Sequence, residues 1–314
     1  MAATPSPETA SPADSSASGT ARHVVVVGID GVRFDTLASA RTPRLDALAA
    51  KGFLRPVQVN PDGATMSGPS WTTMVTGVLP PVHNVFDNDF TRHRIAEYPD
   101  VLTRVRAHGL ATYAAAGWPP LVSAASGGPV FLGGGLLPND DPGHDLAAWD
   151  TTDDTITADA CRVLAGPDCP AAAFIYLGAP DVNAHELGVG PAYVTSIERS
   201  DLRLGRILDT IEARGSYAEE EWTVIVATDH GHLDEGGHGG DSPEERTAWI
   251  AAAGASLPPV PPATLEQADV AAHTLTALGI AIAPAVGGGH DGRSPQGPDP
   301  TQWRLYGVPF GARD

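Results

Sequence analysis

Apolar residues fall into short uninterrupted runs that alternate along the chain with longer segments of helical periodicity. Three runs consist mostly of β-branched and large apolar residues, and they predict buried strands at residues 23–29 (HVVVVGI), 172–177 (AAFIYL) and 222–228 (WTVIVAT). Two weaker runs, at residues 110–116 and 247–252, predict further strands. Uninterrupted apolar runs are typical of parallel strands that are covered on both faces.

Helical segments lie between these runs. The clearest covers residues 43–51, where Thr42 is expected as the N-cap, Pro43 takes the first helical position and Gly52 follows the end. Four more helices are predicted at residues 67–77, 151–164, 192–214 and 267–278. Residues 127–150, rich in Gly, Pro and Asp, are expected to form a long loop. The alternation predicts an α/β fold with a mainly parallel central sheet flanked by helices on both faces.

The first 22 residues differ in composition from the rest of the chain. They are biased toward Ala, Ser, Pro and Thr, with neither a basic start nor an apolar core, so they predict a disordered leader and not a secretory signal. Residues 23–314 are expected to form a single domain, since no internal repeat or clear linker divides them. No stretch of about 18 apolar residues occurs, and we expect a cytoplasmic protein without a membrane partner.

The charge balance narrows the class of partner. The 314 residues include 38 acidic and 19 basic side chains, a net charge of −19, and Lys51 is the only lysine. Nucleic-acid polymers and anionic membranes need clustered Lys and Arg, so this balance argues against both. The two cysteines, Cys161 and Cys169, cannot form a disulfide framework in so long a chain; their spacing fits a single local disulfide or two reduced thiols.

Candidate metal ligands stand at the carboxyl ends of the three buried strands. Asp30 follows the first strand, Asp181 and His185 follow the second, and Asp229 and His230 follow the third. Each alone fits a turn residue or a helix cap. Because ligands of open α/β sheets bind outside the carboxyl ends of the strands, the three together indicate a metal site. Mixed imidazole and carboxylate ligands suit zinc, with manganese as the second choice.

Residues 229–240 (DHGHLDEGGHGG) carry the strongest of these signals. Three histidines and three acidic residues lie within these twelve positions, interleaved with glycines. An apolar strand that runs straight into Asp, His and Gly packs poorly but presents ligands well. A solvated polar loop is the alternative interpretation.

Ser67 is the candidate nucleophile and precedes a predicted helix. Pro69 fits the first turn of that helix and places Ser67 at or near the N-cap. The positive end of the helix would favour an alkoxide at Ser67 and an incoming anion beside it. An ordinary capping role for Ser67 is the alternative.

Six regions of the chain follow an order and spacing known from one superfamily. They are residues 30–33 (DGVR), 42–52 (TPRLDALAAKG), 67–88 (SGPSWTTMVTGVLPPVHNVFDN), 180–188 (PDVNAHELG), 238–241 (HGGD), and 269–270 with 275–280. On these residues the chain resembles the alkaline phosphatase superfamily, and within it the type I phosphodiesterase/nucleotide pyrophosphatase branch. The resemblance implies an alkaline-phosphatase-like fold.

The resemblance also implies two divalent metal ions, Zn²⁺ or Mn²⁺, held by side chains of this chain. One ion would be bound by Asp30, Ser67, Asp229 and His230, and the other by Asp181, His185 and His238. Asn88 matches the asparagine that donates to a phosphate oxygen in the family, with a turn residue as the other interpretation. The resemblance assigns no ligand role to His232 or Asp234, and we expect these neighbours to support the ligands or to be solvated and not to bind a metal themselves.

The reaction implied is hydrolysis through a phosphoserine on Ser67. The branch usually has Thr in place of Ser67, and residues 67–71 also resemble a sulfatase signature in which Trp71 replaces an arginine. No Arg or Lys falls between Arg55 and Arg92, which favours a substrate with little charge on the attacked phosphorus. We therefore expect a phosphodiesterase or nucleotide pyrophosphatase. A phosphomonoesterase is the alternative, and a sulfatase or a non-catalytic relative is less favoured.

The size of the site is expected to be small. Larger members of the superfamily that the chain resembles insert a cap or lid between the corresponding ligands, whereas here His238 follows His230 by only eight positions. Together with the resemblance, this spacing implies a small phosphorylated metabolite or a nucleotide-type substrate. Residues 127–144 are the candidate substrate-facing loop, with an irregular surface connection as the alternative.

Overall fold

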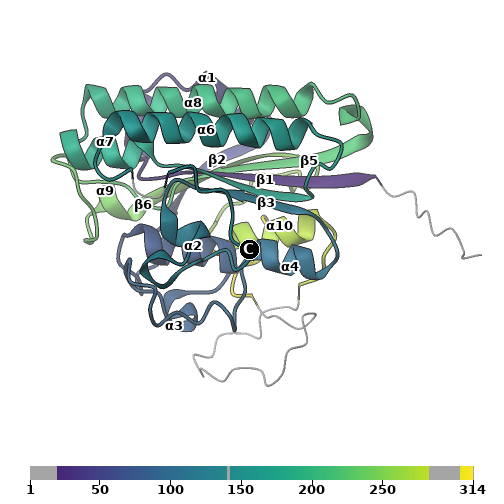
Figure 1. Ribbon diagram of the computed structural model, residues 1–314, viewed down its shortest axis with the longest axis horizontal. Coiled ribbons are helices and arrows are strands. Elements are labelled where there is room, and N and C mark those ends of the chain that lie inside the picture. The colour runs from purple at the N-terminus through teal and green to yellow at the C-terminus, as the bar shows by residue number, and fades with distance from the viewer. Residues whose placement is uncertain (1–19, 140–141, 283–304, 314) are drawn as a thin grey trace, which may run out of the picture.

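The computed structural model describes residues 20–139, 142–282 and 305–313. Its centre is a six-stranded sheet in the order β2-β6-β5-β1-β4-β3 (Figure 1). Strands β5, β1, β4 and β3 pair in parallel, whereas β6 is antiparallel to both of its neighbours, β5 and β2. The strands are β1 (Ala21–Ile29), β2 (Phe53–Gln58), β3 (Thr112–Ala115), β4 (Ala172–Leu177), β5 (Glu220–Ala227) and β6 (Thr247–Gly254).

Helices surround this sheet, and the two longest are α6 and α8. The α-helices are α1 (Pro43–Ala50), α2 (Ser67–Thr76), α3 (Pro80–His83), α4 (Val101–Ala107), α5 (Pro119–Val122), α6 (Leu146–Ala165), α7 (Ala179–Leu187), α8 (Pro191–Glu212), α9 (Pro243–Arg246) and α10 (Asp269–Ala277). Three short 3₁₀ segments are η1 (Asp35–Ala38), η2 (Ala125–Gly127) and η3 (Tyr217–Glu219). No helix within the described ranges combines the length and the apolar character needed to cross a membrane.

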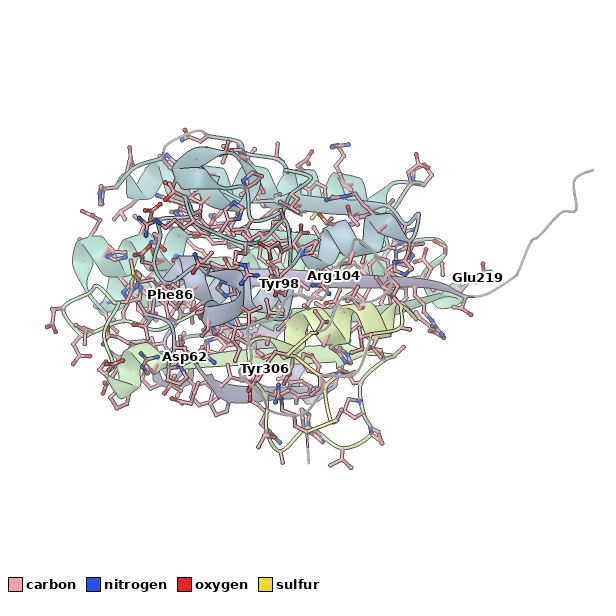
Figure 2. The ribbon with its side chains drawn as sticks, turned by 90° about the horizontal axis from the view of Figure 1, so that it is seen from below. Asp62, Phe86, Tyr98, Arg104, Glu219 and Tyr306 are labelled. Carbon is pink, nitrogen blue, oxygen red and sulfur yellow. The ribbon has the colours of Figure 1, made fainter. Side chains whose placement is uncertain are left out.

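Helices cover both faces of the sheet (Figure 1), and a hydrophobic core lies on each face. Successive side chains of a strand point to opposite faces, so β1 supplies both cores. Val25 and Val27 pack on the side of α1, α6 and α8, whereas Val24 and Val26 pack on the side of α2, α4 and α10. Figure 2 looks onto the second face, where buried Arg104 of α4 ties that helix to the carboxyl end of α2.

The predicted fold class, an α/β fold with a mainly parallel sheet, is confirmed. All five predicted strands are present, and each begins and ends within two residues of its predicted limits. Strand β1 begins at Ala21, inside the expected leader, and residues 1–19 of that leader lie outside the described residues. Thr42 stands at the N-cap of α1 as expected, but its hydroxyl contacts the side chain of Asp46 and does not cap the backbone.

Helix α6 corrects the prediction of a long loop over residues 127–150. The helix begins at Leu146, five residues before the predicted start at 151. Asp145 is the N-cap, and its carboxylate accepts the backbone N–H groups of Ala147 and Ala148 at 2.9 and 3.1 Å. An aspartate in this position satisfies N–H groups that have no partner inside the helix, so it starts the helix earlier than the apolar pattern indicates.

The sequence prediction misses six strands or α-helices, which are β2, α3, α4, α5, α7 and α9, and three of them show why. Strand β2 (FLRPVQ) contains Pro56 and lacks clear alternation, and it lies at the edge of the sheet, where a missing N–H is tolerated. Helix α4 is short and begins at Asp100, whose side chain accepts the N–H of Thr103 at 2.9 Å. Helix α7 covers the segment after β4 that carries Asp181 and His185.

Trp71 connects the core to the end of strand β1. Its side chain is fully buried and packs edge-on against Phe174 and Tyr176, with ring centroids 5.7 and 5.9 Å away. A Cβ atom placed on Gly28 would lie 2.6 Å from the indole ring. The indole therefore occupies the space that any side chain at position 28 would need.

We predict that Gly28→Ala destabilises the protein. The added methyl group forces the Trp71 ring to move, and overpacking of this kind costs about 1–3 kcal/mol of unfolding free energy. Urea denaturation measures the change. Gly215→Ala is the matched control, because a Cβ there meets no atom within 4 Å, and we expect a change below about 0.5 kcal/mol. Equal denaturation midpoints for the two variants would contradict the prediction.

Candidate metal centre

Three carboxylates meet at one edge of the sheet. Asp30 directly follows β1, Asp229 comes two residues after β5, and Asp181 lies in the first turn of α7, which follows β4. Strands β5, β1 and β4 are neighbours and run in parallel, so their carboxyl ends lie side by side. The predicted convergence of the three strand ends is therefore present, at the edge where open α/β sheets bind ligands.

The first cluster consists of Asp30, Asp229, His230 and Ser67. The Nε2 atom of His230 lies 3.2 Å from Oδ2 of Asp229 and 3.6 Å from Oδ1 of Asp30. The Oγ atom of Ser67 lies 3.3 Å from the same Nε2 atom. All four side chains are buried.

The oxygens that face His230 have no hydrogen-bond partner among the described residues. They are Oδ1 of Asp30 and Oδ2 of Asp229, and both are buried. On Asp30 the other oxygen, Oδ2, accepts from Trp71 Nε1 at 2.9 Å and from Tyr176 Oη at 2.7 Å. On Asp229 the other oxygen accepts the N–H of Gly31 at 3.1 Å. An unpartnered buried carboxylate oxygen is costly, and two of them beside an imidazole nitrogen fit a bound cation.

The raised pKa values of Asp30 and Asp229 also indicate a cation site. Burial, and next the charge of Asp181, raises the pKa of Asp30 to about 7, although the hydrogen bonds from Trp71 and Tyr176 act against this. Burial, and next the charge of Asp30, also raises the pKa of Asp229 well above its usual range. A divalent cation between these groups would remove the repulsion and keep both carboxylates ionised.

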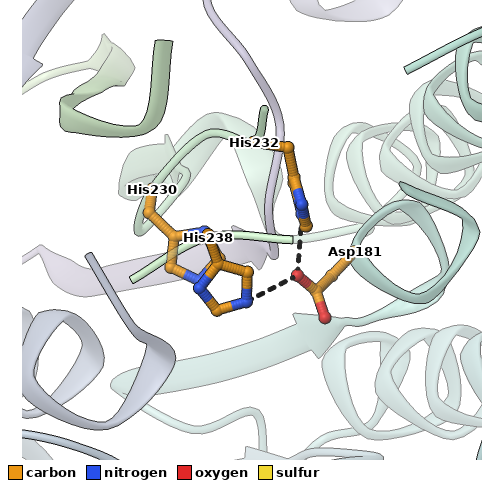
Figure 3. A group of neighbouring side chains, drawn as sticks. All are labelled: Asp181, His230, His232 and His238. Carbon is orange, nitrogen blue, oxygen red and sulfur yellow. Dashed lines mark hydrogen bonds and ion pairs between the residues drawn. The ribbon is translucent and has the colours of Figure 1, made fainter. Parts of the chain in front are cut away.

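The second cluster surrounds Asp181, and Figure 3 draws two of its members, Asp181 and His238. The Nε2 atoms of His185 and His238 are 2.9 Å apart, and each lies 3.6 Å from an oxygen of Asp181. The Nδ1–H group of His238 donates to the carbonyl oxygen of Thr65 at 2.7 Å, which leaves its Nε2 lone pair for a ligand. In the first cluster the Nδ1–H of His230 likewise donates to the carbonyl of Gly231 at 3.1 Å. Both imidazoles thus present Nε2 to the centre.

Helix α7 holds two of these side chains, Asp181 and His185, four residues apart and so on one face of the helix. Its start is fixed by Asp153 of α6, whose carboxylate accepts the N–H groups of Gly178 and Ala179, both at 3.0 Å. Burial raises the pKa of Asp153 to about 7, and the nearby guanidinium of Arg203 opposes this rise. A capping contact from another helix thus sets the position of α7.

His232 and Asp234 are expected from the sequence to support the ligands or to be solvated, and the structure gives each a defined contact. His232 is fully buried and lies with its Nε2 atom 2.9 Å from Oδ1 of Asp181 (Figure 3). Donor atoms of Asp181, His230, His232 and His238 all lie within 4.8 Å of one another. Asp234 forms an ion pair with Arg33 at 2.5 Å. The sequence signal for His232 is its place in the His-rich segment that also contains the candidate ligands His230 and His238.

Ser67 is the first residue of α2, and Met66 occupies the N-cap position. The amide of Asn88 lies at the same helix start, because its Oδ1 atom accepts the N–H of Gly68 at 2.8 Å. A Cβ on Gly68 would lie 2.2 Å from the carbonyl oxygen of Asp87, so a glycine lets the two segments approach. The structure therefore brings Asn88 next to the candidate nucleophile.

The candidate substrate-facing loop, residues 127–144, is described except for residues 140–141. Its last residue, His144, is exposed and pairs at 2.6 Å with Glu186 of α7. Glu186 directly follows His185 in the sequence. This end of the loop therefore borders the helix that carries two candidate ligands. The two cysteines lie in the described part of the chain and are both free, which fits two reduced thiols.

The chain is similar in sequence to one family of known proteins. A sequence model of the type I phosphodiesterase / nucleotide pyrophosphatase family matches residues 24–245, well over half of the chain. No curated protein sequence matches. The fold and the match define a metal-dependent phosphoric ester hydrolase of the alkaline phosphatase superfamily. The chain belongs to the type I phosphodiesterase/nucleotide pyrophosphatase family.

Solved structures support the fold. A putative sulfatase from Bacteroides thetaiotaomicron is similar at a TM-score of 0.66 and 14% identity, over 84% of this chain and 72% of that one. Murine ectonucleotide pyrophosphatase/phosphodiesterase 5, an inactive variant in complex with AMP, is similar at a TM-score of 0.50 and 21% identity. That similarity covers 67% of this chain and 57% of the murine chain, so the chain spans little more than half of it. The predicted alkaline-phosphatase-like fold is confirmed.

We predict that Tyr176→Phe weakens cation binding at the first cluster. The change removes one of the two donors that hold Oδ2 of Asp30, and loss of such a contact lowers metal affinity about 10-fold to 100-fold. Competition with a chromophoric zinc chelator measures the affinity. Tyr113→Phe is the control, since that hydroxyl donates to Asp159 at 2.9 Å, away from the cluster. If both variants hold zinc as tightly as the unaltered protein, Tyr176 does not orient Asp30.

Proposed function

We propose that the protein is a two-metal hydrolase that cleaves a small phosphodiester or nucleotide pyrophosphate through a phosphoserine on Ser67. One observation carries the proposal: the unpartnered oxygens of Asp30 and Asp229 and the Ser67 hydroxyl all face Nε2 of His230. A candidate nucleophile therefore lies beside a candidate cation site. The chain's membership of a family of phosphoric ester hydrolases supports the same reaction.

Two donor sets would hold the cations. Asp30, Ser67, Asp229 and His230 would bind the first cation, and Asp181, His185 and His238 would bind the second. Imidazole and carboxylate donors suit zinc, with manganese as the second choice. When bound, such cations lower the pKa of a hydroxyl and neutralise charge that develops on phosphate oxygens.

The chain's own residues would carry out the covalent chemistry. Ser67 loses its hydroxyl proton to solvent, and Oγ forms a bond to phosphorus while the bond from phosphorus to the leaving oxygen breaks; the leaving oxygen, with its electron pair, takes a proton from solvent. A water oxygen then bonds to phosphorus while the bond from Oγ to phosphorus breaks, the water gives up a proton to solvent, and Oγ takes one back to restore the hydroxyl. The α2 N-terminus at Ser67 favours the anionic group in both steps. Asn88, with Oδ1 held by Gly68, has its NH₂ group left to donate to a phosphate oxygen.

The preference for a diester rests on the state of Arg33. This arginine belongs to the first motif, but its guanidinium is engaged by Asp35, at 2.6 and 3.0 Å, and by Asp234 at 2.5 Å. The sequence has no Arg or Lys between Arg55 and Arg92. A monoester carries one more negative charge than a diester, so this site favours the diester.

The substrate class is a proposal as well. The murine relative was solved with AMP, which supports a nucleotide-type molecule or another small phosphorylated metabolite. The net charge of −19 argues against a nucleic-acid polymer and an anionic membrane as partners. A cytoplasmic location stays a prediction from the sequence.

We predict faster hydrolysis of a diester than of a monoester. With zinc or manganese present, kcat/KM for bis-p-nitrophenyl phosphate should exceed that for p-nitrophenyl phosphate about 10-fold, equivalent to about 1.4 kcal/mol. p-Nitrophenyl sulfate should be the poorest substrate, because Trp71 replaces the sulfatase arginine and donates to Asp30. Faster turnover of the monoester would show a phosphomonoesterase instead.

We predict that Ser67→Ala abolishes turnover. Loss of the nucleophile should lower kcat by about 10³-fold or more, with zinc content measured alongside to show that the cations remain. Ser256→Ala is the control, since its hydroxyl contacts Thr223 near the start of β5, at the opposite end of the sheet. A Ser67→Ala variant with full activity would exclude the covalent route.

A further inference from the structure

We propose that His232 is a positioning residue for the second cation, because its Nε2–H group holds one oxygen of Asp181 and leaves the other for the metal. The proposal rests on the assignment of Asp181 to the second cation. The family resemblance gave position 232 no role, and the contact comes from the structure alone.

The first cluster shows the pattern that His232 would complete. Each of its carboxylates has one oxygen occupied by protein donors and one unpartnered oxygen that faces His230. On Asp181, Nε2 of His232 lies 2.9 Å and Nε2 of His238 lies 3.6 Å from Oδ1, whereas Oδ2 lies 3.6 Å from Nε2 of His185. Oδ1 is thus the oxygen that His232 holds, and Oδ2, which among the described residues faces only the candidate ligand His185, is the oxygen left for the second cation.

The position of the proton on His232 distinguishes a donor from a ligand. A carboxylate oxygen only accepts, so Nε2 carries the hydrogen at 2.9 Å from Asp181. Nδ1 is then a lone pair, and it is buried without a partner among the described residues. As a metal ligand through Nε2, His232 would need its proton on Nδ1, which would leave a buried N–H donor unpartnered. An orphan N–H is rarer in proteins than an under-satisfied acceptor, so the donor role fits better.

The backbone at Gly31 leaves space for the contact between His232 and Asp181. A Cβ on Gly31 would lie 2.5 Å from Nε2 of His232 and 2.8 Å from Oδ1 of Asp181, so the pair occupies the space beside this glycine. Gly31 has φ of 67°, a conformation that favours glycine. Its own N–H donates to Asp229. One residue thus lies against a carboxylate of each cluster.

The test compares two variants that differ in whether they keep a donor. His232→Leu removes the N–H group, and His232→Gln keeps an N–H donor at a similar reach. Purified protein is stripped of metal and refilled with zinc, and both affinities are measured by titration against a chromophoric chelator, with zinc content by mass spectrometry. We expect His232→Leu to bind the second zinc about 10-fold to 100-fold more weakly, with the first within threefold, and His232→Gln to stay close to the unaltered protein.

A spectroscopic readout separates the donor role from the ligand role. The visible spectrum of the cobalt-substituted protein reports the ligand set, and we expect it to be the same in His232→Gln and the unaltered protein. A changed spectrum, or zinc loss in His232→Gln equal to that in His232→Leu, would make His232 a ligand and overturn the proposal. Equal second-site affinity in His232→Leu and the unaltered protein would also overturn it.

Two controls separate this inference from the proposed function. His144→Gln alters an exposed histidine that pairs with Glu186 on α7, and both zinc affinities should be unchanged. If the unaltered protein takes up fewer than two zinc ions, the two-metal assignment itself is wrong. If it takes up two and His232→Leu matches it, only the role of His232 is wrong. Should His232→Leu fail to fold, the cobalt spectrum of His232→Gln still distinguishes a donor role of His232 from a ligand role.

Discussion

The convergence of three carboxylates at one edge of the sheet is the constraint on which the rest of the site depends. Asp30, Asp229 and Asp181 follow neighbouring parallel strands, and the first two are fully buried. Like charges in such a place repel and lose their hydration, which raises the pKa of Asp30 and Asp229. They are tolerated in the ionised form only with donors on one side and a cation on the other.

Much of the surrounding structure can be explained as support for these carboxylates. Trp71 and Tyr176 reach one oxygen of Asp30, and the backbone of Gly31 reaches one oxygen of Asp229. Gly28 makes room for the Trp71 ring, so a residue of strand β1 and a residue of helix α2 depend on each other. The net charge of −19 counts only the residues of the chain. Metal ions bound at this edge would add local positive charge, so the negative total is compatible with an anionic substrate.

The sequence predicted the main elements where local signals agree with the tertiary fold. Uninterrupted apolar runs identified the central strands, since each strand is covered on both faces. Prediction failed where distant contacts decide. Strand β2 exists because β6 pairs with it, and α7 is capped by Asp153, a side chain of another helix. The start of α6 at Asp145 was a local capping signal that the composition of the predicted loop concealed.

The sequence by itself determined the fold class and the list of candidate ligands, because strand ends and motif spacing are local properties of the chain. It did not determine which oxygen of each carboxylate is left for a cation, nor that His232 lies on Asp181. Those facts depend on side chains brought together from β1, β4, α2 and the loop after β5, tens to hundreds of residues apart. Only the packing of the sheet and its helices puts these donors within hydrogen-bond distance.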